Sequence, residues 1–297
     1  MFNSLKIYFT SDFLKKWITG ILGWFASNKF GLVTRLMIEF FISFYKISLS
    51  ECIKSHSNEY STFNSFFVRI LKTQLRPIDP NPYIITVPVD GKITQIGYIK
   101  GNKLLQAKNH YYTIDALLAG DKIMSAKFLN GDFITIYLSP NNYHRVHMPC
   151  DGVLREMTYV PGCLYSVNLI NVYNIPNLFA LNERVICYFD TYIGPLIQIM
   201  IGAIIVGSIE TVWAGTIIPP RGRVIKKWYY PDANNKNAIK LLKGQEMGMF
   251  KIGSTVVNLF TPGRIQFIKE LEPKKNILLG EPLAIKLPII PKITFCS

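Results

Sequence analysis

The sequence predicts an α+β protein in which a mostly antiparallel β core follows a set of N-terminal helices. Short β-branched runs broken by glycines begin at Ile84, and this spacing is typical of antiparallel sheets. Residues 1–55 instead carry longer apolar runs rich in Leu, Ile, Phe and Trp, which favour helices. With 297 residues, 49% of them hydrophobic, the chain can bury a full core. The clearest strands are expected at 84–89, 93–99, 133–138, 185–189, 196–206 and 256–260.

The N-terminal helices have the composition of membrane-associated helices. Their longest run without a charge, residues 17–28, has 12 residues, whereas a spanning helix needs about 20. Residues 1–55 contain seven Lys or Arg against three Asp or Glu, with Trp17 and Trp24 nearby. Cations beside aromatic residues indicate helices that lie in the interface of an anionic bilayer. A soluble helical hairpin packed on the core is the alternative, and a cleaved signal peptide is not expected.

The boundary between the helical segment and the main domain is expected near residue 60. Residues 60–80 read as a helix that ends at the prolines after Arg76. The predicted domains are therefore 1–60, the membrane-associating segment, and 61–297, the main domain. Residues 191–209 carry no charge, but two β-branched strands interrupted by glycine and Pro195 are expected there instead of a spanning helix.

Charge and cysteine content narrow the classes of partner and compartment. The formal net charge of +14 favours a phosphate-bearing partner, either nucleic acid or an anionic membrane, and composition alone does not separate the two. The five cysteines are odd in number and show neither a C-x-x-C pair nor metal-ligand spacing. A reduced protein on the cytosolic side fits this pattern best.

Gly253 and Ser254 form the stretch with the most distinctive chemistry. Apolar residues flank the pair, so residues 253–255 are expected at a sharp bend between two buried strands. Such a bend brings the Ser254 hydroxyl over the Gly253 carbonyl, where attack would turn the amide into an ester. Elimination from that ester would cut the chain and leave a precursor of a pyruvoyl group at residue 254. Gly-Ser pairs are also ordinary turn residues, and Gly207-Ser208 is a second pair.

Three other polar residues could take part in that chemistry. Asp90 precedes a glycine at the end of an expected strand, and His144 and His147 lie three residues apart, so one helical turn would place both on one face. A metal pair is not expected, because no third ligand is grouped with the histidines. Asp90, His147 and Ser254 have the residue types of an orienting group, a base and a nucleophile. The sequence alone does not bring them together.

The region around Ser254 resembles the processing site of the phosphatidylserine decarboxylase proenzymes, and the resemblance runs densely over residues 60–265. The family's Asp-Gly, His-x-x-His-Met-Pro and Gly-Ser-Thr motifs match at Asp90, at His144 to Pro149 and at Gly253 to Thr255. Further matching segments are TFNSFFVR (62–69), LRPID (75–79), CDGVLREM (150–157), YVPG (159–162), NLFALNER (177–184) and VGSIETVWAG (206–215).

This resemblance implies a membrane-associated, pyruvoyl-dependent enzyme that converts phosphatidylserine to phosphatidylethanolamine and CO2. The proenzyme would cleave itself between Gly253 and Ser254 into a β chain (1–253) and an α chain (254–297) that stay associated. Ser254 would become the covalent pyruvoyl cofactor and Schiff-base partner, with no metal. Asp90 would orient His147, which would deprotonate Ser254 Oγ, and His144 would contact the substrate or supply a proton.

The same resemblance implies the partners and the location. We expect a phospholipid substrate, an anionic membrane surface and no nucleic acid, with the protein peripheral to the cell membrane on its cytoplasmic side. The sequence does not decide whether the protein forms a homo-oligomer. Two alternatives remain at this point: a non-enzymatic basic membrane-surface protein with an inert Gly-Ser turn, and a Ser-His-Asp lipid hydrolase. The hydrolase lacks its G-x-S-x-G elbow.

Overall fold

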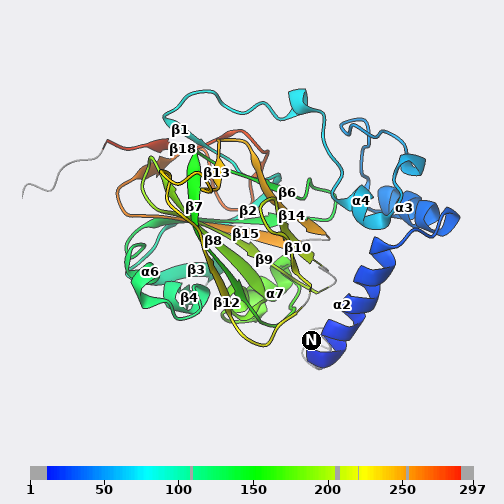
Figure 1. The fold of residues 1–297 in the computed structure, drawn as a ribbon, viewed down its shortest axis with the longest axis horizontal. Coiled ribbons are helices and arrows are strands. Elements are labelled where there is room, and N and C mark those ends of the chain that lie inside the picture. Colours follow the sequence, from blue (N-terminus) through cyan, green and yellow to red (C-terminus); the bar gives the residue numbers. More distant parts are fainter. Residues whose placement is uncertain (1–11, 108–109, 205–207, 220, 252–253, 289–297) are drawn as a thin grey trace, which may run out of the picture.

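The computed structural model describes residues 12–107, 110–204, 208–219, 221–251 and 254–288. Figure 1 shows a β body with two helices, α2 (Asp12–Ser27) and α3 (Leu32–Tyr45), projecting from one side. Every pair of strands in the described sheets is antiparallel. The predicted α+β class, with an antiparallel core and N-terminal helices, is therefore confirmed.

The largest sheet has nine strands, and β15 lies in its interior. Its order is β12 (Lys226–Tyr229), β7 (Gly152–Val160), β8 (Arg184–Thr191), β9 (Leu196–Ile201), β15 (Ser254–Phe260), β5 (Asp132–Leu138), β2 (Gly91–Tyr98) and β17 (Asn276–Ile277), with β13 (Lys240–Leu241) also paired to β7. Because β15 pairs with β9 on one side and β5 on the other, the segment that follows the predicted cleavage bond is hydrogen-bonded along both edges.

Three smaller sheets and several short helices complete the β body. The four-stranded sheet runs β11 (Gly215–Ile218), β10 (Ser208–Thr211), β14 (Glu246–Lys251) and β6 (Arg145–His147). The others are β1 (Ile84–Thr86), β18 (Pro282–Lys286) and β16 (Ile265–Phe267), and the pair β3 (Lys103–Ala107) and β4 (His110–Thr113). The short helices are α5 (Ile114–Leu117), α6 (Lys122–Ala126), α7 (Leu169–Asn174) and α8 (Leu178–Leu181).

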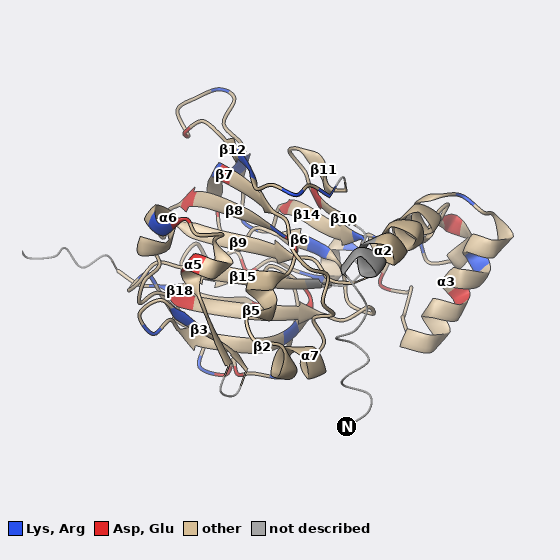
Figure 2. Cartoon of the chain, turned by 90° about the horizontal axis from the view of Figure 1, so that it is seen from below, with Lys and Arg blue, Asp and Glu red and all other residues tan. Residues whose placement is uncertain are grey.

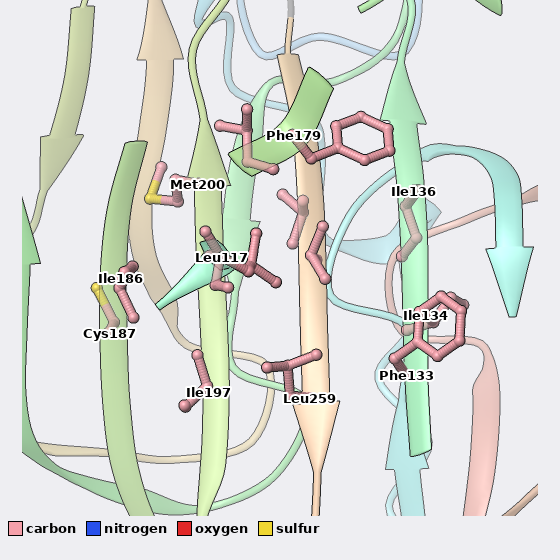
Figure 3. Close-up of a cluster of buried hydrophobic side chains, with 14 of the residues drawn as sticks. Leu117, Phe133, Ile134, Ile136, Phe179, Ile186, Cys187, Ile197, Met200 and Leu259 are labelled. Atoms are coloured by element: carbon pink, nitrogen blue, oxygen red, sulfur yellow. The ribbon is translucent and has the colours of Figure 1, made fainter. Parts of the chain in front are cut away.

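The main core packs against both faces of the large sheet at its centre, because every residue of β9 is buried and successive residues point to opposite faces. Figure 3 shows Ile136 from β5, Ile197 from β9 and Leu259 from β15 together with Leu117 of α5 and Phe179 of α8. All five side chains are almost completely buried, and burying each such side chain stabilises the fold by about 1.5–3 kcal/mol. The apolar runs that predicted strands at 133–138, 185–189 and 256–260 supply many of these residues.

Residues 60–80 differ from the single helix that the sequence predicts. The α-helix there is α4 (Phe63–Phe67), which has only five residues, and its start is fixed by a capping box between Thr62 and Ser65. A one-turn 3₁₀ helix, η2 (Thr73–Leu75), follows, and another, η1 (Ser57–Glu59), precedes. Between α4 and η2, Leu71 forms a β-bridge with Cys52, so a tertiary contact replaces the expected helical turns. The division of the chain at residue 60 stays a prediction.

The N-terminal helices form a second, smaller apolar cluster and leave much apolar surface exposed. Ile38 of α3 and Phe66 of α4 are completely buried in this cluster. On its other side, α3 presents a stripe with i, i+4 spacing whose side chains are 56–70% exposed: Leu32, Leu36, Phe40 and Phe44. In the described part of the chain, no helix combines the length and the apolar character needed to cross a membrane.

Candidate active site

The predicted cleavage bond lies where the chain passes from the four-stranded sheet to the nine-stranded sheet. Strand β14 ends at Lys251 and β15 begins at Ser254, so Ser254 and Thr255 of the predicted bend belong to a strand instead. Ile252 and Gly253 lie outside the described residues. The backbone of Ser254 pairs with Leu138 of β5. Ser254 is therefore the first residue of an interior strand, directly after the predicted scissile bond.

His147 ends strand β6, opposite Glu246 of β14. Its Nδ1 lies 2.8 Å from the carbonyl oxygen of Gly244, and since a carbonyl only accepts, Nδ1 is the nitrogen that carries the proton. Its Nε2 lies 3.2 Å from the hydroxyl of Tyr143 and is left as the acceptor. Burial lowers the pKa of His147, opposed mainly by the Gly244 carbonyl. The imidazole is thus neutral at physiological pH with a lone pair on Nε2, which is the form required of a general base.

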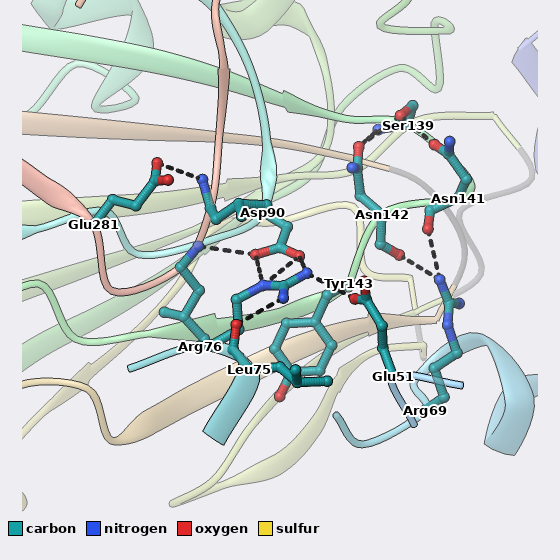
Figure 4. A network of polar contacts seen from close by, with 12 residues as sticks. Glu51, Arg69, Leu75, Arg76, Asp90, Ser139, Asn141, Asn142, Tyr143 and Glu281 are labelled. Atoms are coloured by element: carbon teal, nitrogen blue, oxygen red, sulfur yellow. Dashed lines mark hydrogen bonds and ion pairs between the residues drawn. The ribbon is translucent and has the colours of Figure 1, made fainter. Parts of the chain in front are cut away.

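Asp90 is buried between β1 and β2 and is held by Arg76 (Figure 4). The Arg76 guanidinium donates from Nε to Oδ1 at 2.9 Å and from Nη2 to Oδ2 at 2.7 Å, and the Leu279 N–H also donates to Oδ1 at 2.8 Å. The carboxylate therefore shares no hydrogen bond with His147 in this arrangement of the described residues. The two residues are nonetheless near each other, because the backbone N–H of His147 donates to the carbonyl of Pro88, two residues before Asp90. Burial lowers the pKa of His147 overall, and the charge of Asp90 acts in the opposite direction.

His144 lies in a different environment from His147. Its side chain is completely buried, with its ring stacked on Phe67 of α4 at a centroid distance of 4.1 Å. Burial lowers the pKa of His144 to about 3, although the carbonyls of Pro140 and Ser139 act in the opposite direction. Neither ring nitrogen makes a hydrogen bond of good geometry to a described residue. The imidazole is therefore neutral throughout the physiological range.

The two histidines do not share a helical face as their spacing allowed. His147 belongs to a β-strand and His144 lies just before it, so the helical geometry considered for the pair is wrong. Pairing of this segment with β14 in the four-stranded sheet overrides any helical preference. As a result, His147 keeps a partner on each ring nitrogen while His144 packs against an aromatic ring.

A cavity of about 400 Å³ leads from α2 toward the strand that precedes the predicted cleavage bond. Gly20 and Trp24 of α2 line one side, and Ser208, Arg221 and Lys251 line the other. Ser208 pairs with Lys251 in the register of β10 and β14, and its buried hydroxyl has no hydrogen-bond partner among the described residues. An unpaired buried hydroxyl beside this strand is suited to bind a polar group that enters the cavity.

A second, polar cavity of about 190 Å³ lies beside Asp90. Arg76 and Tyr143 line it from the β body, and Lys46 and Glu51 line it from the N-terminal segment. The Arg76 Nη2 that contacts Asp90 also contacts Glu51 at 3.2 Å. Arg76 thus links the candidate site to the N-terminal segment.

Three contacting residues were not singled out by the sequence: Arg76, Tyr143 and Ser208. Arg76 lies in the LRPID segment, so the motif contained it without indicating its partner. Ser208 was noted only as part of a second Gly-Ser pair, and its place beside β14 comes from strand pairing. Tyr143 gave no separate signal, although it lies only four residues before His147.

The family of this chain follows from comparison with known proteins. A family model described as phosphatidylserine decarboxylase matches residues 63–285. The chain belongs to the phosphatidylserine decarboxylase family. Two curated relatives, from Escherichia coli O9:H4 (strain HS) and from strain SMS-3-5 / SECEC, are each 53% identical to it over 285 residues, which cover 96% of this chain and 88% of each relative. Both are named phosphatidylserine decarboxylase proenzyme.

Membership confirms the enzymatic function that the motifs predicted. The chain is a phosphatidylserine decarboxylase whose proenzyme is processed autocatalytically into α and β chains. The family generally uses a pyruvoyl group, and no group of three or more His, Cys, Asp or Glu in the described residues could hold a metal ion. A non-enzymatic protein with an inert Gly-Ser turn does not account for this membership.

Proposed function

We propose that this phosphatidylserine decarboxylase makes its pyruvoyl group from Ser254 by cutting its own chain after Gly253. The products would be a β chain of residues 1–253 and an α chain of residues 254–297. The main support is the position of β15, which starts at Ser254 and pairs with both β5 and β9. Because those hydrogen bonds do not depend on the Gly253–Ser254 peptide bond, the α chain would remain in the core after cleavage.

The cleavage uses groups of this chain alone. Ser254 Oγ attacks the Gly253 carbonyl carbon, the new C–O bond replaces the C–N bond, and the Oγ proton passes through His147 to the freed nitrogen of Ser254. Removal of the Ser254 α-proton then breaks the Cβ–O bond, which leaves a carboxylate on Gly253 and a dehydroalanine. Water converts the dehydroalanine to the pyruvoyl group and ammonia.

His147 is the proposed base, and Asp90 supports it. The Gly244 carbonyl fixes the proton on Nδ1, so Nε2 is the atom that accepts the Ser254 proton. The Asp90 charge favours the imidazolium formed in that step. A direct Asp90–His147 hydrogen bond, as in a catalytic triad, would require the carboxylate to leave Arg76. We assign Asp90 an electrostatic role while Arg76 holds it.

After cleavage, the pyruvoyl ketone supplies an electron sink for the loss of CO2. The fit of such a group is supported by the 400 Å³ cavity beside β14 and by the unpaired hydroxyl of Ser208 on its wall. His144 is the proposed contact for the substrate head group or the proton donor. Because its ring is neutral and packed on Phe67, it would act through a neutral N–H and would have to move away from that ring to be reached.

The substrate is proposed to enter from a bilayer bound by α2 and α3. The side chains of Trp17 and Trp24 on α2 are 59% and 62% exposed, and the exposed stripe of α3 adds further apolar surface. Apolar side chains of this kind insert at the boundary of head groups and acyl chains. We place the protein at the periphery of the cell membrane, on its cytoplasmic side, where anionic lipids attract its net positive charge.

Intact mass of the purified protein tests this proposal. Wild type should separate under denaturing conditions into two chains, one of them the 44 residues 254–297 with a pyruvoyl terminus. Ser254→Ala should stay a single chain of 33.9 kDa without activity, because no Oγ is present to attack. Ser55→Ala, at an exposed serine, is the matched control and should be cut normally. A cleaved Ser254→Ala protein would end the mechanism.

A further inference from the structure

An exposed strand at the edge of the large sheet is not used by the decarboxylation site. Among the described strands, β12 pairs with β7 alone, and all four of its residues are exposed. We propose that this strand and the residues before it are a second contact with an anionic phospholipid bilayer, additional to α2 and α3. The proposal extends the membrane association put forward above. The residues of this surface, called the β12 patch, are Arg223, Val224, Ile225, Lys226, Trp228 and Tyr229.

The charge of this region suits a phosphate-rich surface. Residues 221–243 contain seven Lys or Arg and one acidic residue, Asp232. Arg221 and Lys227 are paired with carboxylates of the β body, at Glu183 and Asp121 respectively, and so attach the segment to the fold. Arg223 and Lys226 are exposed and make no ion pair with any residue that the structure describes. These two cations are therefore available for lipid phosphates.

The apolar side chains of the patch match the interfacial layer of a bilayer. Tyr229 is 73% exposed and Val224 is 65% exposed, and Ile225 and Trp228 are also exposed. Trp and Tyr prefer the head-group level, where their apolar rings and polar atoms are both accommodated. Lysines on an edge strand oppose its pairing with another strand. Lys226 and Lys227 thus favour a bilayer over a second copy of the chain as the occupant of this surface.

The patch lies on the same side of the molecule as α2. In Figure 1, β12 and the N-terminal end of α2 both lie on the lower side, and Figure 2, seen from below, shows both elements on the viewed face. The cavity beside α2 supports this arrangement, because Trp24 lines it together with Pro219 and Arg221, which lead directly into the patch. A bilayer that binds α2 from this side would therefore also reach β12.

Vesicle binding by a triple variant tests the patch. Arg223→Gln/Lys226→Gln/Tyr229→Ser, made in the full chain, removes two cations and one exposed ring from β12 and the segment before it. We expect binding to vesicles of phosphatidylcholine with phosphatidylglycerol to weaken roughly thirtyfold, which corresponds to about 1 kcal/mol for each cation. Binding to phosphatidylcholine alone should change much less, because no anionic lipid is then present.

The control removes the same charge and ring from another side of the molecule. Tyr83 precedes β1, which lies on the upper side of Figure 1, and Lys269 and Lys274 are exposed near the C-terminal strands. Tyr83→Ser/Lys269→Gln/Lys274→Gln has the same net charge as the patch variant and should bind vesicles as wild type does. Both triples should yield the 44-residue α chain, which shows that they fold.

Two results would overturn the proposal. The first is equal binding by the patch variant and the control. The second is loss, in the patch variant alone, of a dimer that wild type forms in sedimentation, which would make β12 an interface between copies. A separate variant, Trp17→Ser/Trp24→Ser, tests α2: if it binds like wild type, the helical contact proposed above fails, whereas the result for β12 stands on its own.

Discussion

The ion pair between Arg76 and Asp90 should contribute more to the stability of the fold than the exposed ion pairs do. Replacing Arg76 with Gln, in a Ser254→Ala background that keeps one chain, would remove the guanidinium that donates to both carboxylate oxygens. The side chains of Arg76 and Asp90 are only 13% and 4% exposed. Asp90 would keep the Leu279 N–H as its hydrogen-bond donor, with little water to replace the lost charge.

The expected loss of stability follows from this burial. Removing one partner of a buried ion pair lowers the free energy of unfolding by about 3–5 kcal/mol. Because Arg76 is partly exposed, we expect a loss of about 3 kcal/mol, at the lower end of that range. Arg155 and Asp190 make an ion pair of similar length, 2.8 Å, but their side chains are 34% and 47% exposed. Arg155→Gln should therefore cost no more than about 1 kcal/mol, since water screens exposed pairs. The difference between the two variants isolates the effect of burial.

Urea denaturation followed by tryptophan fluorescence would measure both variants. The free energy of unfolding should fall by at least about 2 kcal/mol more for Arg76→Gln than for Arg155→Gln. Adding Asp90→Asn to Arg76→Gln should recover part of the loss, because no buried charge is then left without its partner. Equal losses for the two arginine variants would refute the argument, because they would show that Asp90 does not depend on Arg76.

The remaining predictions concern the two histidines. His147→Ala should accumulate full-length chain, with cleavage slowed by about 10²- to 10⁴-fold. His144→Ala should still be cut, but it should decarboxylate phosphatidylserine poorly per mole of cleaved enzyme. Normal cleavage in both variants would mean that another group activates Ser254. Because burial lowers the pKa of His147 below its usual 6.5, the base stays deprotonated as the pH falls through 6.5, and the cleavage rate of wild type should decline only at lower pH. The cleavage rate would be measured from the amount of α chain released with time. A decline centred at or above pH 6.5 would contradict the assignment of His147 as the base.

Local patterns along the chain were sufficient to predict several elements of the fold. The β-branched run at 256–260 predicted β15, and the charged breaks in the N-terminal apolar runs predicted helices too short to span a membrane. The motif around Ser254 identified the family before any contact was known. These inferences succeed because side-chain periodicity and short motifs are properties of neighbouring residues.

The surroundings of each polar side chain depend on tertiary contacts that no local pattern predicts. His144 and His147 are three residues apart and chemically identical, yet one is packed on Phe67 and the other is held by Gly244, nearly a hundred residues along the chain. The same holds for Asp90, whose partner Arg76 was part of a recognised motif without any sign of the contact. Burial and long-range pairing set the protonation state and orientation of these groups, and neither is encoded in the spacing of residues along the sequence.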